Sequence, residues 1–293
     1  MSVPAAFIAV VMIWSTTPLA IKWSTLGTSF GFAVFARMAL GTALCLLLLA
    51  MLRVRMPWRR GARLTYLAGG LGLFVAMTLT YWSSQYISSG LISVLFGLSP
   101  IATSLIAAYW LDEEAITPAK LAGMLLGVLG LGLVFRHNLS LGAHALAGVV
   151  ALLGAVLAQS ASMVTIKRIA DQASPVATNL GTLTVALPLF GATWWLSDGQ
   201  LPAGVPERAT AAIVYLGFFG SVLGFVLYYY LIKHLATAQV ALITLITPVL
   251  ALWLGHALNQ EAVSPDVWLG TGGILLGLSL HQWGDRFRAR LKS

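Results

Sequence analysis

Aromatic and amide side chains recur at helical spacing within one long apolar segment of this chain. A helix would place four of them, at i, i+3, i+4 and i+7, on one face: Thr78, Tyr81, Trp82 and Gln85. Rings with a polar edge suit the wall of a wet cavity, where they can stack on a flat solute, although such rings also form belts at membrane surfaces. We expect Tyr81, Trp82 and Gln85 to line a substrate cavity, joined by Tyr229 from a later run of tyrosines.

Prolines and one deep amide mark other apolar segments. Pro18 frees a backbone carbonyl inside the first segment, and Pro100 and Pro248 occupy matching places in two later segments. Gln159 lies deep in another segment, where an uncharged amide should face the interior of the protein rather than lipid. The prolines are either hinges between moving parts or adjustments of packing, and the sequence leaves both interpretations open.

Arg37 is the charged residue that lies well inside an apolar segment. An ionisable group within a membrane is a functional candidate, and the guanidinium fork matches a substrate carboxylate. Two other interpretations stay open: the side chain extends to the membrane surface, or it binds carbonyl groups at a helix end. Arg37 is therefore a candidate contact for a charge or a carboxylate.

The titratable residues form no recognisable catalytic or metal-binding pattern. The nine acidic residues fall in predicted loops or at segment ends, which predicts that no carboxylate is buried. The five histidines are scattered, the single cysteine has no partner, and there is neither a phosphate-binding loop nor a nucleophile motif. We therefore expect no catalytic residue, no metal, no cofactor and no enzymatic activity.

Composition indicates which elements must position these residues. Charged residues make up 9% of the chain, against about 25% in ordinary globular proteins, and the mean hydropathy is +0.89. Ten apolar segments approach the roughly 20 residues that a helix needs to cross the hydrocarbon core. Because they are continuously apolar, they predict an all-α membrane protein with ten transmembrane helices: 4–23, 31–52, 64–83, 89–111, 118–135, 144–166, 178–196, 209–232, 238–258 and 266–283.

One phrase occurs twice and divides the chain into similar halves. Residues 111–118 read LDEEAITP, and residues 258–265 read LNQEAVSP. In each copy the Thr or Ser suits a helix N-cap, the next proline suits the first helical position, and the glutamate can accept from free backbone amides. Glu114 and Glu261 are predicted structural corners, with gating or a proton-linked role as the alternative. The repeat implies three regions: an N-terminal domain over 1–137, a C-terminal domain over 138–285 and a basic tail over 286–293.

The distribution of positive charge orients the predicted helices. Most lysines and arginines, including the cluster at 53–63, lie in segments that face the cytoplasm if both termini do. Each half holds five helices, an odd number, so the second half should enter the membrane upside down. Such inverted repeats can alternate between inward-open and outward-open packings. Glycines four residues apart, Gly123 with Gly127 and Gly273 with Gly277, suit either packing inside the bundle or a dimer seam.

Several of these features together resemble the EamA-like drug/metabolite transporters. They are the two five-helix halves, the run Trp-Ser-x-x-Pro-x-x-x-Lys from Trp14 to Lys22, Arg37 in the second segment, and the repeated Glu-x-x-(Ser/Thr)-Pro ending. The similarity covers essentially the whole chain and is greatest to the YddG-type amino-acid exporters. It implies a carrier whose central cavity is lined by Trp14, Tyr81, Trp82, Ser93, Gln159, Ser162 and Tyr229.

The resemblance also implies a function. The expected protein is a secondary transporter of the bacterial inner membrane that exports small metabolites, above all amino acids including aromatic ones, by alternating access. An expected lack of buried acids favours a neutral or zwitterionic solute over a cationic drug. The alternative is an exporter of nucleosides, sugars or drug-like solutes, with or without proton coupling. The expected partners are a small-molecule substrate and membrane lipid, with a monomer or homodimer as the unit. The net charge of +8 reflects topology rather than nucleic-acid binding.

Overall fold

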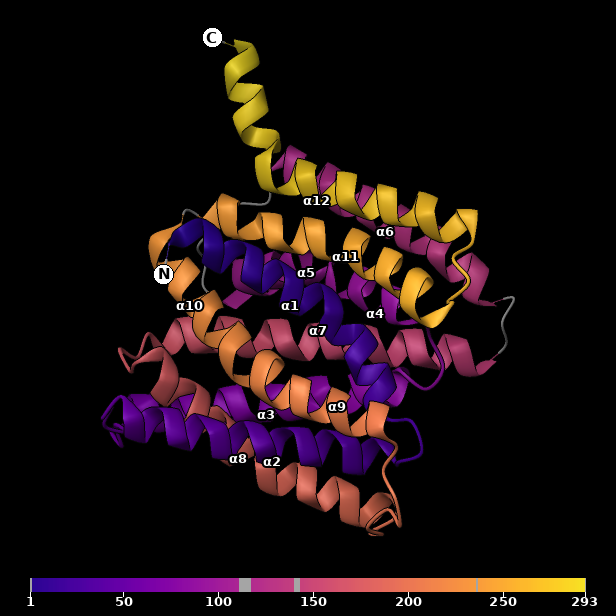
Figure 1. Cartoon of the computed structure of the whole chain (residues 1–293). Coiled ribbons are helices and arrows are strands. Elements are labelled where there is room, and N and C mark those ends of the chain that lie inside the picture. Colours follow the sequence, from indigo (N-terminus) through magenta and orange to yellow (C-terminus); the bar gives the residue numbers. More distant parts are fainter. Residues whose placement is uncertain (1, 111–116, 140–142, 236, 293) are drawn as a thin grey trace.

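The computed structural model describes residues 2–110, 117–139, 143–235 and 237–292. Across these residues the chain is built of helices and contains no β-strand. Figure 1 shows the helices side by side in a bundle. They are α1 (Val3–Ser24), α2 (Phe30–Met51), α3 (Arg60–Ser83), α4 (Ser89–Phe96), α5 (Ser99–Trp110), α6 (Pro118–Leu139), α7 (Ala143–Ile169), α8 (Pro175–Ser197), α9 (Glu207–Tyr215), η1 (Leu216–Leu223), α10 (Gly224–His234), α11 (Thr237–Asn259) and α12 (Pro265–Lys292).

Helices occupy each of the ten ranges expected from the sequence, apart from Leu52 at the end of the second range, and the fourth range is divided into α4 and α5. Pro100 has no N–H to donate to the carbonyl of Phe96, and the Ser99 hydroxyl donates to that carbonyl instead, at 2.6 Å. This proline therefore lies at a break between two helices. By contrast, Pro18 and Pro248 lie inside α1 and α11, which continue past them.

The eighth range is a continuous run of α9, η1 and α10, in which η1 is a π-helix. Seven described ranges are long and apolar enough to cross a membrane, and α6 and α11 contribute shorter apolar stretches. The chain is therefore an all-α, multi-pass membrane protein. The seven are Val3–Ser24, Phe30–Met51, Arg60–Ser83, Ser89–Trp110, His144–Ile169, Pro175–Ser197 and Glu207–Tyr228.

Helices α6 and α12 pack along each other at one edge of the bundle, while α2 and α8 lie at the opposite edge (Figure 1). Glycines allow the first pair to approach closely. A Cβ on Gly123 would lie 2.5 Å from the carbonyl oxygen of Gly277, and a Cβ on Gly130 would lie 2.6 Å from that of Gly270. These glycines pack against each other within one chain, which agrees with packing inside the bundle rather than with a dimer seam.

The helix starts predicted from the repeated phrase are confirmed. Helices α6 and α12 begin at Pro118 and Pro265. The hydroxyl oxygens of Thr117 and Ser264 accept from the amide three residues further on, at 3.2 and 3.3 Å, which is the geometry of an N-cap. The part of the first copy that contains Glu114 lies outside the described residues.

Candidate functional site

Arg37 lies buried about two turns into α2 and is only 3% exposed. Its Nε donates to the Ser221 hydroxyl of η1 at 3.1 Å, and its Nη1 reaches the Tyr81 hydroxyl of α3 at 3.5 Å. The ion pairs found in the described part of the chain join other residues, so no described acid pairs with this guanidinium. Arg37 does not extend to the membrane surface, as snorkelling would require.

Small residues allow the helices to close around Arg37. A Cβ on Gly220 would lie 3.0 Å from Arg37 Nη2, and a Cβ on Gly41 would lie 2.8 Å from Ser221 Cβ. Gly220 and Ser221 belong to η1, and π-helical segments are rare and occur frequently at functional sites. The positive charge is therefore held in one orientation by α2, α3 and η1 together.

A second set of polar contacts continues from Ser221. The Asn179 side chain of α8 donates to the Ser221 carbonyl oxygen at 3.0 Å and lies 3.8 Å from the Cys45 sulfur of α2. All three side chains are buried. The sequence does not single out Ser221 or Asn179, although the reasoning that places Gln159 in the interior applies equally to an asparagine inside α8.

The predicted aromatic stripe on α3 is divided in the structure. Tyr81 is fully buried and faces Arg37. Trp82 packs on Tyr86, with ring centroids 4.9 Å apart. Gln85 lies beyond the end of α3 and is exposed, and its side-chain amide donates to the Trp82 carbonyl oxygen at 3.2 Å. The four-residue face does not form because α3 ends at Ser83.

The remaining predicted cavity residues lie on four different helices. Trp14 of α1 packs against Tyr228 of α10, with ring centroids 4.7 Å apart. Gln159 of α7 has a buried Oε1 without a hydrogen-bond partner among the described residues. Ser162 donates to a carbonyl of α3 at 2.9 Å, and Ser93 is buried in α4. Tyr229 lies in α10, and its side chain is outside the described part of the structure.

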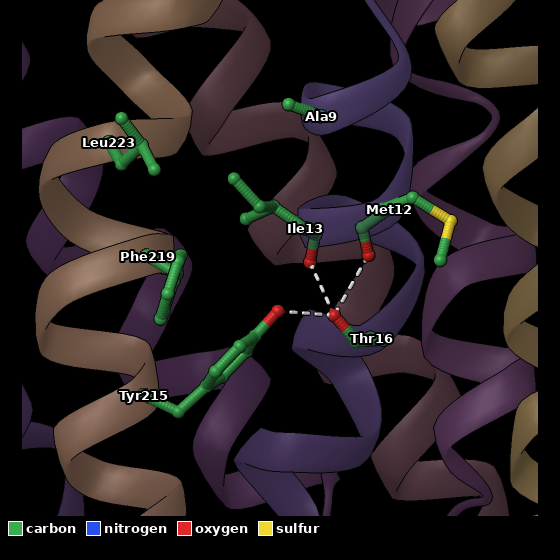
Figure 2. A pocket seen from close by; sticks show the side chains of 7 residues that line it. All are labelled: Ala9, Met12, Ile13, Thr16, Tyr215, Phe219 and Leu223. Atoms are coloured by element: carbon green, nitrogen blue, oxygen red, sulfur yellow. Dashed lines mark hydrogen bonds between the residues drawn. The ribbon is translucent and has the colours of Figure 1, made fainter.

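A crevice with a volume of about 310 Å³ lies between α1 and the run of α9 and η1 (Figure 2). Its polar groups are paired with each other, because the Thr16 Oγ1 lies 2.6 Å from the Tyr215 hydroxyl and also donates to the Met12 carbonyl oxygen at 2.8 Å. The crevice can hold a hydrocarbon group or a ring but offers no charge. Its lining contains none of the residues predicted from the sequence: Ala9, Met12, Ile13, Thr16, Tyr215, Phe219 and Leu223.

Two carboxylates are buried, which corrects the expectation that none is. The Glu261 side chain is 7% exposed and lies 3.8 Å from Lys22 Nζ. The Asp171 side chain is 5% exposed and accepts from Arg59 at 2.7 and 3.0 Å. Both acids do lie in loops, but each loop folds back onto a helix start. The bonds from Arg59 hold the pKa of Asp171 below its usual range.

Comparison with known proteins places these features in a family. The model of the EamA-like transporter family matches twice, over residues 2–136 and 146–281. An uncharacterized transporter of Archaeoglobus fulgidus is 24% identical over 92% of this chain and 94% of its own length. The protein PagO of Salmonella typhimurium is 24% identical over 95% and 92% of the two lengths.

A further relative, a probable terminal-alkyne amino-acid exporter of Streptantibioticus cattleyicolor, is 26% identical over 92% of this chain and 91% of its own length. Among solved structures, one titled only as the crystal structure of a protein is 19% identical, has a TM-score of 0.69, and covers 100% of this chain and 99% of its own. That likeness supports the fold. The relatives of similar length support a membrane transporter with a small-molecule substrate.

Proposed function

Since the chain belongs to the EamA-like transporter family, we propose that it is a secondary transporter that exports amino acids, including aromatic ones, from the cytoplasm. The relative in Streptantibioticus cattleyicolor that is named a probable amino-acid exporter supports this substrate class. The finer resemblance to YddG-type exporters points in the same direction. The proposed location is a bacterial inner membrane, with both termini in the cytoplasm.

The observation that carries the proposal is Arg37. A guanidinium buried in a membrane protein is costly unless an anion or several acceptors compensate its charge. Here the described contacts are the hydroxyls of Tyr81 and Ser221, and no described acid pairs with the cation. The planar fork fits a carboxylate through two parallel bonds. We assign Arg37 to the carboxylate of the substrate and Tyr81 and Ser221 to its orientation.

Aromatic and amide groups elsewhere supply the rest of the proposed path. Trp14 with Tyr228 offers ring surface from α1 and α10. The buried Gln159 Oε1 is an acceptor without a described partner, which a substrate ammonium group can satisfy. An amino acid brings a carboxylate, an ammonium and a side chain, and these three kinds of group match the three kinds of chain residue.

Alternating access is supported by how the two halves pack. Contacts made by a helix of one half recur for the corresponding helix of the other half. The first helices of the two halves are α1 and α7: α1 packs on α11, and α7 packs on α5. In the same way, α3 packs on α8, and its counterpart η1 packs on α2. In three further contacts, a helix packs on its own counterpart in the other half: α4 on α11, α2 on α8, and α6 on α12. Such a pattern fits two five-helix repeats, over 1–137 and 138–285, related by a two-fold axis. The proposed hinges are the break at Pro100 and the prolines inside α1 and α11, Pro18 and Pro248.

The test is uptake by purified protein in liposomes. Labelled neutral and aromatic amino acids are compared with the amines that lack their carboxylate, with nucleosides and with cationic dyes, with and without a pH gradient. Saturable flux of amino acids but not of the matched amines supports the proposal. Flux of amines, nucleosides or dyes without amino acids contradicts it and favours the alternative of a drug-like or nucleoside substrate.

Variants of Arg37 separate its function from its packing. Arg37→Lys retains the charge and loses the fork, whereas Arg37→Gln loses both. We expect affinity for amino acids to fall by about tenfold or more in Arg37→Gln and by less in Arg37→Lys, as for a lost charge-assisted bond. The exposed Arg63→Gln is the matched control, and its affinity should stay unchanged. Unchanged affinity in Arg37→Gln would leave this arginine a packing role only.

Cysteine labelling tests the inverted arrangement. Single cysteines replace Ala115 in the first copy of the repeated phrase and Ala262 in the second. An impermeant maleimide added to intact cells should label residue 262 and should reach residue 115 only after the membrane is opened. Labelling of both from the same side would contradict the inversion.

A further inference from the structure

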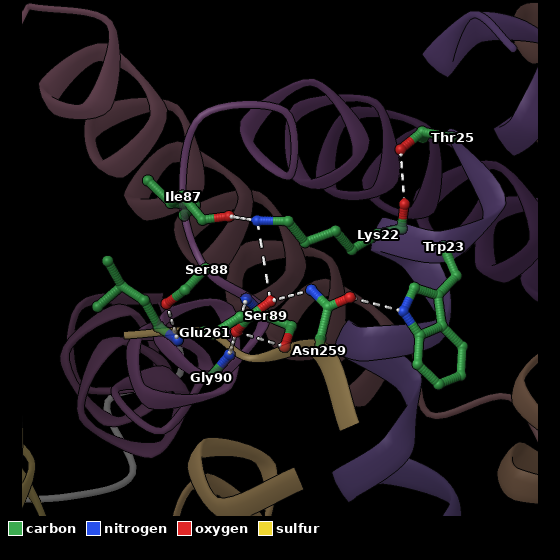
Figure 3. A network of polar contacts seen from close by, with 10 residues as sticks. Lys22, Trp23, Thr25, Ile87, Ser88, Ser89, Gly90, Asn259 and Glu261 are labelled. Carbon is green, nitrogen blue, oxygen red and sulfur yellow. Dashed lines mark hydrogen bonds and ion pairs between the residues drawn. The ribbon is translucent and has the colours of Figure 1, made fainter. Parts of the chain in front are cut away.

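The Glu261 carboxylate gathers donors from three elements at one end of the bundle (Figure 3). Its Oε2 accepts from the backbone amide and the hydroxyl of Ser89, both at 2.9 Å, and from the Gly90 amide at 3.4 Å. Its Oε1 accepts from the Asn259 side chain at 2.9 Å and lies 3.8 Å from Lys22 Nζ. The carboxylate therefore joins the loop after α11 to the start of α4 and the end of α1.

The contacts with α4 supply acceptors for the free backbone amides at the start of this helix. The first amides of a helix have no partner within it, and they carry partial positive charge. The Ser88 hydroxyl accepts from the Leu91 amide at 3.3 Å, and Glu261 accepts from the two amides between them. A Cβ on Gly255 would lie 2.5 Å from Glu261 Oε2, so α11 needs a glycine there for the carboxylate to reach α4.

The end of α1 is tied into the same cluster. Lys22 Nζ donates to the Ile87 carbonyl oxygen, in the connection from α3 to α4, at 2.9 Å. The Trp23 indole donates to the Asn259 side-chain oxygen at 2.9 Å. The printed hydrogen bonds and the ion pair that join the proposed halves in this cluster run to Asn259 or Glu261. Arg208 of the second half adds a cation–π contact, 4.0 Å from the centroid of the Trp23 ring.

We propose that Glu261 is the positioning residue of a lock that keeps this end of the transporter closed. This inference rests on the proposed alternating access, in which the halves must part at one end while they meet at the other. Opening here separates α4 from α11, and the Glu261 carboxylate then exchanges its amide, hydroxyl and ammonium partners for water. Loss of its charge therefore favours the state that is open at this end.

The experiment measures access from each side of the membrane. Ser93, one turn beyond Ser89 in α4 and buried, is replaced by cysteine in a Cys45→Ser background. Reaction with an impermeant maleimide is timed in vesicles of each orientation, with and without Glu261→Gln. The exposed Glu207→Gln, which removes an acid from the start of α9, is the matched control.

Glu261→Gln should raise the labelling rate from the Glu261 side about fivefold or more, the lower range of a conformational coupling, and should lower the rate from the opposite side. Glu207→Gln should change neither rate. A carboxylate that only stabilises the fold would raise both rates together or leave both unchanged, and either result overturns the lock.

A milder variant covers the case in which Glu261→Gln does not fold. Trp23→Phe removes the bond to Asn259 and keeps the ring, and it should shift the two rates in the same opposite directions by a smaller factor. No reciprocal shift in Trp23→Phe would then overturn the lock. The assay needs no substrate. If the labelling rates shift in opposite directions but the liposomes take up no amino acid, the amino-acid assignment alone is rejected. If amino acids are taken up but the labelling rates do not shift in this way, the lock alone is rejected.

Discussion

Glu261 and Asp171 join the two proposed halves at opposite ends of the bundle, and they do so by different means. Arg59, the partner of Asp171, stands at the start of α3, whereas Ser89, a partner of Glu261, follows the end of this helix of 24 residues. Asp171 accepts two short bonds from one arginine whose side chain is 56% exposed. Glu261 accepts from backbone amides, a hydroxyl and an amide side chain, and its lysine is more distant.

The difference shows what a buried carboxylate can control. Water can replace an exposed arginine as the partner of a carboxylate with little change in free energy. The Asp171–Arg59 pair therefore joins two surface segments without favouring one conformation of the transporter. Glu261 accepts from free backbone amides at the start of α4. If the loop that carries Glu261 moves away from α4, those amides lose their acceptor. A buried carboxylate therefore forms a surface ion pair at one end and the proposed lock at the other.

The largest expected effect on stability comes from removing Glu261. Glu261→Ala leaves the first α4 amides without their acceptor and removes the carboxylate beside Lys22, which keeps its bond to the Ile87 carbonyl oxygen. It should lower the free energy of unfolding by about 2 kcal/mol. Asp171→Ala should lower it by less, because Arg59 is already in contact with water. Thermal unfolding of both variants in the same detergent provides the comparison. If Asp171→Ala lowers the free energy of unfolding as much as Glu261→Ala or more, the two carboxylates do not differ in this way.

A smaller effect is expected from removing the lysine alone. Lys22→Met leaves Glu261 with its amide and hydroxyl donors, and Lys22 is itself 30% exposed, so the loss should be about 0.5 to 1 kcal/mol. The same melting measurement checks it. If Lys22→Met matches Glu261→Ala, the contacts of Lys22 with Glu261 and with the Ile87 carbonyl oxygen, rather than the helix start, dominate this end.

The smallest effect should be present at neutral pH and disappear in acid. Because Arg59 lowers the pKa of Asp171, this carboxylate stabilises the fold above its usual pKa of about 3.9 and loses that contribution as the pH falls through the lowered value. Asp171→Asn should therefore melt below wild type at neutral pH, and the gap should close below about pH 4. Exposed Asp198→Asn is the control, and a gap that persists in acid would point to packing instead.

Apolar run lengths were enough to predict the helices, because the membrane demands long apolar segments with internally bonded backbone. The sequence marks Pro100 as a hinge or an adjustment of packing but does not predict that the helix divides there. Whether a proline bends or ends a helix depends on what replaces the lost bond, here the Ser99 hydroxyl. The start of α12 at Pro265 followed from local capping rules that tertiary structure left intact.

Sites were harder to predict than helices. The shared face of Tyr81, Trp82 and Gln85 assumed a helix through residue 85, and α3 ends at Ser83. The burial of Glu261 depends on how its loop folds over α4, a long-range contact that no local pattern reports. A lone charge in an apolar run is visible in sequence, which makes Arg37 a candidate before its contacts are known, whereas its contact Ser221 is an ordinary serine until the helices are packed.

Exchange across liposomes tests the central claim of alternating access most directly. Purified protein is reconstituted, and uptake of a labelled aromatic amino acid is measured into liposomes that are either empty or preloaded with the same unlabelled compound. A carrier that must reorient predicts faster labelled uptake into preloaded liposomes, and Glu261→Gln should change that acceleration. Equal rates into empty and preloaded liposomes would contradict a reorienting carrier and indicate an open pore.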